Sequence, residues 1–333
     1  MRKFSCIVAV LAVASIAPAQ DWIPLDYDAE AAPADNPLKG FIPYTGSYSF
    51  PHSMEFDYIG LDRLMSGMDA FTFETGLEPL LNRMAGRGHQ AMIRVFIDYP
   101  GERNALPEFL TDAGVRQHRY FSDGGGRSPD YQDARLLAAL ESFIAAFGAR
   151  YDGDPRIGFI ELGLLGHWGE WHTYPQEQLA PTRATQNRIL TAYDAAFDST
   201  RLLVSQDLLG YAQPADIALH DIGLHDDDFA NNTLPPGADQ FWSRVLAQGL
   251  GDLWQTRVIG GEVQPDYEEV IWNQPSGAPE DFFAAASTTH ASWMLNHAAF
   301  ENNWPAAKRE RALAAARALG YELFVPEARI NAT

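Results

Sequence analysis

The sequence has 333 residues, a formal net charge of −20 and a single cysteine, Cys6. A surface this acidic repels nucleic acid and anionic membranes, and a lone cysteine cannot form an internal disulfide. The length suits one large α/β barrel or two ordinary domains.

The first residues are typical of an export signal. Arg2 and Lys3 precede an apolar run over residues 7–16 that is too short to span a bilayer, and residues 17–19 (Ala-Pro-Ala) fit the small-x-small cleavage rule. We therefore expect a signal peptide over residues 1–19. The mature chain, 20–333, would be secreted or periplasmic, without cysteine and free of the membrane. An uncleaved membrane anchor is the alternative.

Short apolar runs of β type alternate with amphipathic helical stretches along the mature chain. The predicted strands cover residues 40–44, 56–61, 91–98, 157–165, 201–206, 222–225, 257–262 and 291–296. Helices are expected over about 77–84, from an N-cap at Asp130 to a stop at Gly148, over 182–197, around 241–246 and over 305–320. Residues 321–325 resemble a last strand or cover segment. Eight strands with crossover helices predict an α/β fold, a single (β/α)8 TIM barrel.

In such barrels the active site lies at the C-terminal ends of the strands. The third predicted strand ends at Asp98, the fifth is followed by Asp207, and the sixth runs into His225 and Asp227. Acidic and imidazole side chains are therefore expected to gather on one rim.

The segment after the fourth strand carries the sharpest signal. Residues 166–172 read Gly-His-Trp-Gly-Glu-Trp-His, which sets Glu170 between two aromatic neighbours, Trp168 and Trp171. Partial desolvation raises the pKa of a carboxyl group, which suits a proton donor, and flanking indoles could stack on a sugar face. The alternative is a turn in which Glu170 merely caps a helix.

A second glutamate, Glu262, follows an apolar run through Gly260 and Gly261 at the end of the seventh strand. Strands four and seven lie across the barrel mouth from each other, so Glu170 and Glu262 can face the same bond. Hydrolysis of a glycosidic bond needs two such carboxyl groups, one to protonate the leaving oxygen and one to attack the anomeric carbon or activate water. Taken alone, Glu262 could be a surface residue at a strand end.

Several segments carry a resemblance to known families. A glutamate after strand four and another after strand seven resemble the arrangement of clan A glycoside hydrolases. Nearly all of the mature chain also resembles a bacterial family of barrel proteins known mainly as a domain of unknown function (the 4832 type), through residues 36–41, 151–157, 166–172 and 260–262. The resemblance implies that Glu170 is the acid/base and Glu262 the nucleophile of a retaining hydrolase. Clan A enzymes usually carry Asn before the acid/base, where this chain has Gly169.

The remaining rim residues are candidates for substrate binding rather than for chemistry. They are Trp168, Trp171, His172, Asp98, Asp207, His225, Asp227 and Trp293. Trp293 on the eighth strand could form the floor of a sugar-binding subsite, or it could be an ordinary core residue. Arg94 could pair with a rim carboxylate, although a structural ion pair is the commoner fate of an arginine in a strand.

Two other functions remain open. A metal-dependent hydrolase could draw ligands from Asp98, His172, Asp207, His225 and Asp227, but there is no His-x-His on the first strand and no His-Glu-x-x-His helix. A carbohydrate-binding barrel without catalysis is the other. We expect a carbohydrate partner, no cofactor and no metal, because no phosphate-binding loop or dinucleotide turn is present.

Overall fold

The computed structural model describes residues 22–25, 33–102, 104–210, 216–301, 303–322 and 327–331. The predicted signal peptide, residues 1–19, lies outside the described residues, and so does most of the predicted last segment over 321–325. The described chain forms two compact units, of which one holds residues 33–321 and the other includes the two terminal strands. Among the described residues, none of the helices has both the length and the apolar character needed to cross a membrane.

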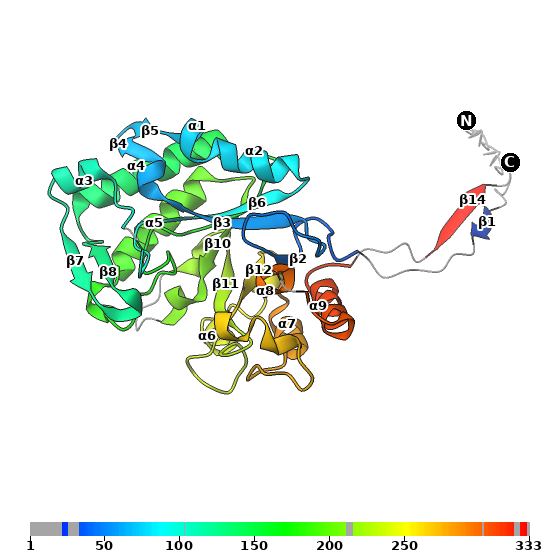
Figure 1. Cartoon of the computed structure of the whole chain (residues 1–333). Helices are drawn as coiled ribbons and strands as arrows, with labels where there is room; N and C mark the ends of the chain where they lie inside the picture. The colour runs from blue at the N-terminus through cyan, green and yellow to red at the C-terminus, as the bar shows by residue number, and fades with distance from the viewer. Residues whose placement is uncertain are drawn as a thin grey trace, which may run out of the picture. The chain divides into compact units, whose positions relative to one another are not determined.

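Eight parallel strands form a nearly closed barrel, which confirms the predicted α/β barrel fold (Figure 1). In chain order they are β2 (Gly40–Ile42), β3 (Met54–Gly60), β6 (Gln90–Phe96), β9 (Ile157–Glu161), β10 (Arg201–Ser205), β11 (Ile222–Phe229), β12 (Ile259–Val263) and β13 (Trp293–Leu295). Each coincides with one of the predicted strands. The barrel closes between β2 and β3 through the bridge of Tyr44 with Phe56, where Thr45 N–H donates to Phe56 O at 2.9 Å.

Helices surround the strands (Figure 1). They are α1 (Phe73–Gly76), α2 (Glu78–Gly86), α3 (Glu108–Asp112), α4 (Ala134–Tyr151), α5 (Arg183–Ala196), α6 (Phe241–Ala247), α7 (Phe282–Thr289), α8 (Ala298–Glu301) and α9 (Ala306–Ala318). Three antiparallel strand pairs lie outside the barrel: β4 (Met65–Gly67) with β5 (Ala70–Phe71), β7 (Gln117–Tyr120) with β8 (Gly126–Pro129), and, in the smaller unit, β1 (Trp22–Leu25) with β14 (Ala328–Asn331).

Both predicted ends of helix α4 were wrong. The N-cap is Asp133 rather than Asp130, because the Asp133 carboxylate accepts the Arg135 backbone N–H at 2.9 Å. Gly148 lies inside the helix instead of ending it. A Cβ at Gly148 would come within 2.2 Å of the Ala196 carbonyl oxygen, so this glycine serves the close packing of α4 on α5.

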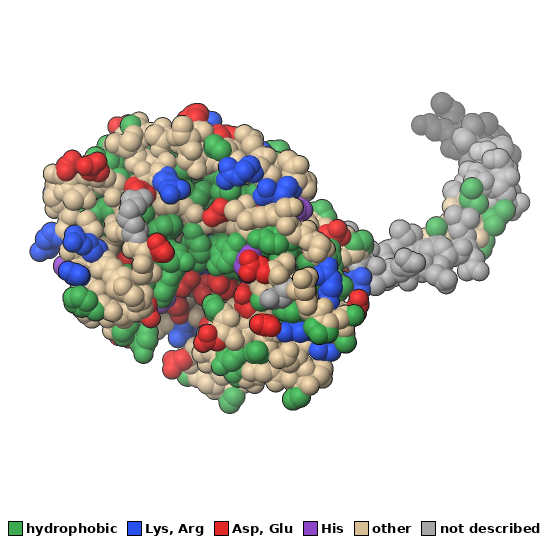
Figure 2. All heavy atoms as spheres, viewed as in Figure 1, with side chains coloured by type: hydrophobic (Ala, Val, Ile, Leu, Met, Phe, Trp, Pro, Cys, Tyr) green, Lys and Arg blue, Asp and Glu red, His purple; other side chains and the backbone are tan. Residues whose placement is uncertain are grey.

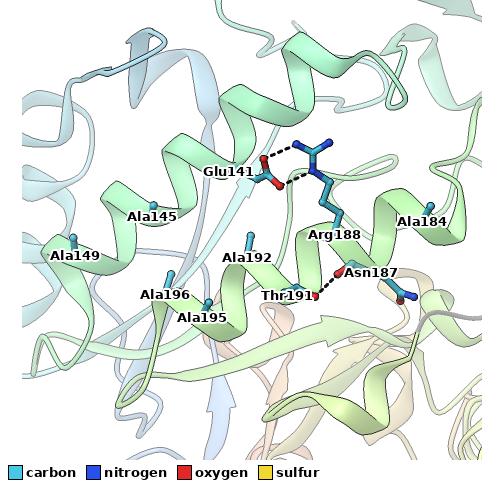
Figure 3. Close-up of a pocket in the computed structure, with 10 residues that line it drawn as sticks. All are labelled: Glu141, Ala145, Ala149, Ala184, Asn187, Arg188, Thr191, Ala192, Ala195 and Ala196. Carbon is cyan, nitrogen blue, oxygen red and sulfur yellow. Dashed lines mark hydrogen bonds and ion pairs between the residues drawn. The ribbon is translucent and has the colours of Figure 1, made fainter.

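The outer surface of the same two helices carries a groove of about 800 Å³. Alanines line most of it, and the ion pair between Glu141 and Arg188 spans the two helices (Figure 3). The groove belongs to the helical layer and not to the barrel mouth.

Alternation along the strands divides the core into two layers. Inward side chains, including Met54, Phe56, Met92 and Phe159, fill the barrel interior, and Trp293 packs among them. Outward side chains such as Ile93 and Ile160 pack against the helices. Inward positions further along the same strands hold polar groups, and these build the candidate site.

Candidate active site

Polar side chains from four strands meet above the apolar layer inside the barrel. Arg94 follows Met92 on the inward face of β6, and Glu161 follows Phe159 in the same way on β9. Asp227 and Glu262 lie on β11 and β12. Because successive inward residues on a strand are two positions apart, these groups sit one layer above the apolar core.

A buried guanidinium is the centre of this layer. Arg94 is 2 % exposed, and its Nε donates to Glu161 Oε2 at 2.5 Å. Its Nη1 donates to Glu170 Oε1 at 2.7 Å and to the Tyr58 hydroxyl at 3.1 Å. Its Nη2 donates to Asp227 Oδ1 at 2.9 Å. One cation therefore holds three carboxylates in fixed directions.

The two glutamates predicted to be catalytic lie together. Glu170, Asp227 and Glu262 each present a carboxylate oxygen, and these oxygens all lie within 4.8 Å of one another. Asp227 is held further by Ser205, whose hydroxyl donates to Oδ2 at 2.6 Å, and by His225 Nδ1 at 2.9 Å from Oδ1.

The three carboxyl groups respond differently to this crowding. Burial opposes ionisation of Asp227, but the charges of His225 and Arg94 hold its pKa below the usual range. Burial raises the pKa of Glu262 well above its ordinary value; Arg94 lowers it in part, and the charges of Glu170 and Asp227 raise it further. Burial and the charge of Asp227 likewise raise the pKa of Glu170. Asp227 therefore carries the negative charge, and the two glutamates favour holding a proton.

His172 borders Glu170 on the side away from Arg94. Its Nε2 lies 3.4 Å from Glu170 Oε2 and 3.8 Å from Asp207 Oδ2. Burial by itself lowers the pKa of His172, but the hydrogen bond to Glu170 and the charge of Asp207 raise it to about 9. Asp207 is held in turn by Arg244 at 3.0 Å.

The loop that carries Glu170 is tightly wound. Positive φ values occur at Leu164, Gly166, Trp168, Gly169 and Trp171. A Cβ at Gly169 would come within 2.9 Å of Gly163 Cα and 3.5 Å of Arg94 Cδ. The position where clan A enzymes carry Asn therefore has no room for a side chain in this backbone.

Three of the predicted sugar contacts are corrected by burial. Trp171 is wholly buried in the core between sheet and helices, and its indole N–H donates to the Leu162 carbonyl oxygen at 2.5 Å. Asp98 is 1 % exposed and accepts hydrogen bonds from the hydroxyls of Tyr120 and Ser128. Trp293 is 1 % exposed within the apolar interior. None of the three can touch a substrate in this structure.

The other predicted contacts fall into two groups. Trp168, His172, Asp207 and Asp227 are partly exposed. His225 is buried behind Asp227, where it can position that carboxylate but not reach a sugar.

Two cavities of about 370 Å³ each are lined by residues that contact this cluster. One is bordered by Tyr58, Phe96 and Tyr99, and the other by His172, Asp207 and Arg244. Tyr58 is bonded to Arg94, and His172 lies beside Glu170. In Figure 2, Asp and Glu side chains gather in a hollow of the face in view.

Sequence reasoning did not name Glu161 as a member of this site. It allowed that Arg94 could pair with a rim carboxylate, as it does with Glu170 and Asp227, but gave a structural ion pair as the commoner fate. The sequence did contain a signal for both residues. Arg94 lies two positions after the inward residue Met92, and Glu161 lies two positions after Phe159, so both charges face the barrel interior. A buried charge needs a partner, so each had to find one inside the barrel.

The predicted set of metal ligands does not come together. Asp98 is enclosed by Tyr120 and Ser128. Two of the three carboxylates that do cluster, Glu170 and Asp227, are bonded to Arg94, whose fixed positive charge disfavours a cation beside it.

No family model matches the chain, and no curated protein matches it. Among solved structures, it resembles the catalytic domain of β-amylase from Paenibacillus polymyxa, at 10% identity and a TM-score of 0.52, over 86% of this chain and 100% of that one. It is also similar to endo-glycoceramidase II from Rhodococcus sp. (12% identity, TM-score 0.48, 78% and 72% covered). A third similar structure is xylanase 10B from Thermotoga maritima (11% identity, TM-score 0.40, 78% and 82% covered). At these identities, the likeness to the β-amylase domain establishes the barrel fold and nothing beyond it.

Proposed function

We propose that this chain is a glycoside hydrolase that cleaves an extracellular carbohydrate with retention of configuration. The observation that carries the proposal is the approach of Glu170 and Glu262, whose carboxylate oxygens lie within 4.8 Å of each other at the barrel mouth. Retaining enzymes separate their two carboxyl groups by about 5–5.5 Å, whereas inverting enzymes need about 6.5–9.5 Å to admit a water.

In the first step Glu262, after releasing its own proton to solvent, attacks the anomeric carbon as a carboxylate, and Glu170 gives its proton to the leaving oxygen. The bond to the leaving group breaks, and a glycosyl ester forms on Glu262. Glu170 is then ionised, and the neighbouring His172, whose pKa is raised to about 9, stabilises it as an imidazolium. Water, deprotonated by Glu170, attacks the ester and frees Glu262.

Asp227 has a supporting role. It stays ionised within 4.8 Å of both glutamates, so it places negative charge where the sugar ring becomes positive in the transition state. Its repulsion also favours the protonated form of Glu170. The partly exposed Trp168, Tyr99 and Asp207 are proposed to contact the sugar and leaving group.

A panel of aryl glycosides and polysaccharides, with the product anomer followed by NMR, tests the proposal. Retention is expected, and Glu170→Gln and Glu262→Gln should each lower kcat by about 10³-fold or more. Added azide should restore turnover to Glu262→Ala, because azide can take the place of the missing carboxylate. The product should be a glycosyl azide whose anomeric configuration is opposite to that of the substrate. Glu170→Ala should keep activity towards substrates with good leaving groups, because they need no proton.

Two results would overturn the assignment. Inversion would remove Glu262 as nucleophile. Carbohydrate binding by the parent protein without turnover of any substrate would instead support a binding barrel.

A further inference from the structure

A second cluster of ionisable side chains lies outside the barrel mouth, where β3 meets β2. It comprises His52, Glu55, Arg87 and His89. Glu55 points to the outer face of β3, because its neighbours Met54 and Phe56 fill the barrel interior. The proposed hydrolysis uses none of these residues.

His52 presents an unused lone pair inside this cluster. Its Nδ1 lies 2.7 Å from the Phe50 carbonyl oxygen, and since a carbonyl only accepts, Nδ1 must carry the hydrogen. Nε2 is then an acceptor, yet it is buried with no partner among the described residues, and the side chain is 7 % exposed. A ring that donates to a carbonyl through one nitrogen and offers the other is typical of metal ligands.

Two more ligand groups lie beside the His52 ring. One nitrogen each from His52 and His89 and one oxygen of Glu55 lie within 4.8 Å of one another, and the imidazole centroids are 4.1 Å apart. Two histidines and one glutamate are a common zinc ligand set that leaves a fourth position open. We propose that His52, Glu55 and His89 bind a divalent transition-metal cation of the zinc class. Tetrahedral bonds of about 2.1 Å put ligands about 3.4 Å apart, so His89 Nδ1 and Glu55 Oε1, which now lie 2.7 Å apart, would separate slightly if both bind the ion.

Arg87 competes for the same carboxylate. Its Nε donates to Glu55 Oε1 at 2.8 Å and its Nη2 to Oε2 at 2.5 Å. Arg87 is 27% exposed, so its guanidinium can move into water when a cation takes Oε1. Thr45 and Gly46 would continue to hold Oε2, each at 3.0 Å. The Arg87 guanidinium and a metal ion would therefore compete for the Glu55 carboxylate.

A cation here would tie together two segments at the closing edge of the barrel. His52 and Glu55 belong to the entry of β3, and His89 precedes β6. A bound ion would therefore add a link between β3 and β6 at the end of the ladder that these strands already share.

The experiment titrates chelator-stripped full-length protein with zinc sulfate, and measures bound zinc by equilibrium dialysis and Tm by calorimetry. We expect one zinc per chain and a Tm raised by about 4 °C at about 100 times Kd. His52→Ala and His89→Ala should each weaken binding by about tenfold or more. Arg87→Gln should strengthen it, a gain that misfolding cannot produce.

Two further variants separate this site from others. His118→Ala, on exposed β7, should bind zinc like the parent protein. Asp227→Asn should also leave binding unchanged. Binding that is lost in Asp227→Asn but kept in His89→Ala would place the ion in the catalytic cluster and overturn the proposal, as would an absence of zinc binding by the parent. Since His89 is partly exposed, its variant decides the matter even if His52→Ala does not fold. The outcome is independent of the proposed hydrolysis.

Discussion

Arg94 is the residue on which the geometry of the candidate site most depends. It is buried and bonded to Glu161, Glu170 and Asp227, so its removal leaves three acidic groups facing one another without the cation that they share. The strand position of Arg94 was readable from the sequence. Its partners were not, because they come from three other elements and only the closed barrel brings them together.

The first prediction concerns the stability that this guanidinium confers. Arg94→Met should lower the free energy of unfolding by about 3–5 kcal/mol at neutral pH, because buried carboxylates lose their only shared cation. Urea unfolding measures it. Arg150→Met is the control, because Arg150 and its partner Glu74 are largely exposed and such a pair contributes about 0–1 kcal/mol. Equal losses in the two variants would contradict the central role of Arg94.

A second prediction follows from the raised pKa of His172. A histidine whose folded pKa rises from 6.5 to about 9 contributes stability that is fully present below pH 6.5 and is lost as the pH rises through about 9. The difference in unfolding free energy between the parent and His172→Asn should therefore shrink across this range. Urea titrations at several pH values test it. In Asp207→Asn the decline should be smaller and should end at lower pH, because one charge that raises the folded pKa is gone.

At the scale of elements, sequence patterns located every barrel strand but not the conformation of the loop that follows β9. The run over 166–172 was recognisable as functional from its composition. Its path was not, because local sequence does not say which of two indoles turns inward. The positive φ at Trp171 sends that side chain into the core, whereas Trp168 remains partly exposed.

The third prediction tests this loop through its glycines. A Cβ at Gly166, where φ is +80°, would lie 2.4 Å from the His172 carbonyl oxygen. Gly166→Ala should cost about 2–3 kcal/mol of stability and lower kcat, because Glu170 moves with the loop. Gly86→Ala is the matched control: Gly86 ends helix α2 with nothing within 4 Å of the added Cβ, so it should be neutral or stabilise by up to about 1 kcal/mol. If Gly166→Ala left both stability and kcat unchanged, the loop would not be rigid.

At the scale of the whole molecule, the strand count predicted the closed barrel because hydrophobic alternation reports directly on burial. Helix boundaries were less readable. The helix end predicted at Gly148 was wrong. This glycine allows close packing against Ala196 of α5, a contact that the local sequence does not show. The strand pairs β1–β14 and β7–β8 were not predicted, because their short runs lack the apolar periodicity of the barrel strands.

The last prediction concerns the acidic balance of the whole chain. With 44 acidic and 24 basic residues, the chain carries 20 more carboxylates than Lys and Arg cations. Their mutual repulsion opposes the compact state, and raising ionic strength from 10 to 150 mM shortens the screening length from about 30 Å to about 8 Å. Sodium chloride should therefore raise Tm over this range, since the repulsion lost exceeds the small contribution of exposed ion pairs. Calorimetry at constant pH measures the shift, with equimolar sucrose controlling for solute effects. A fall in Tm would mean that the surface ion pairs, such as Arg188 with Glu141, outweigh the net charge.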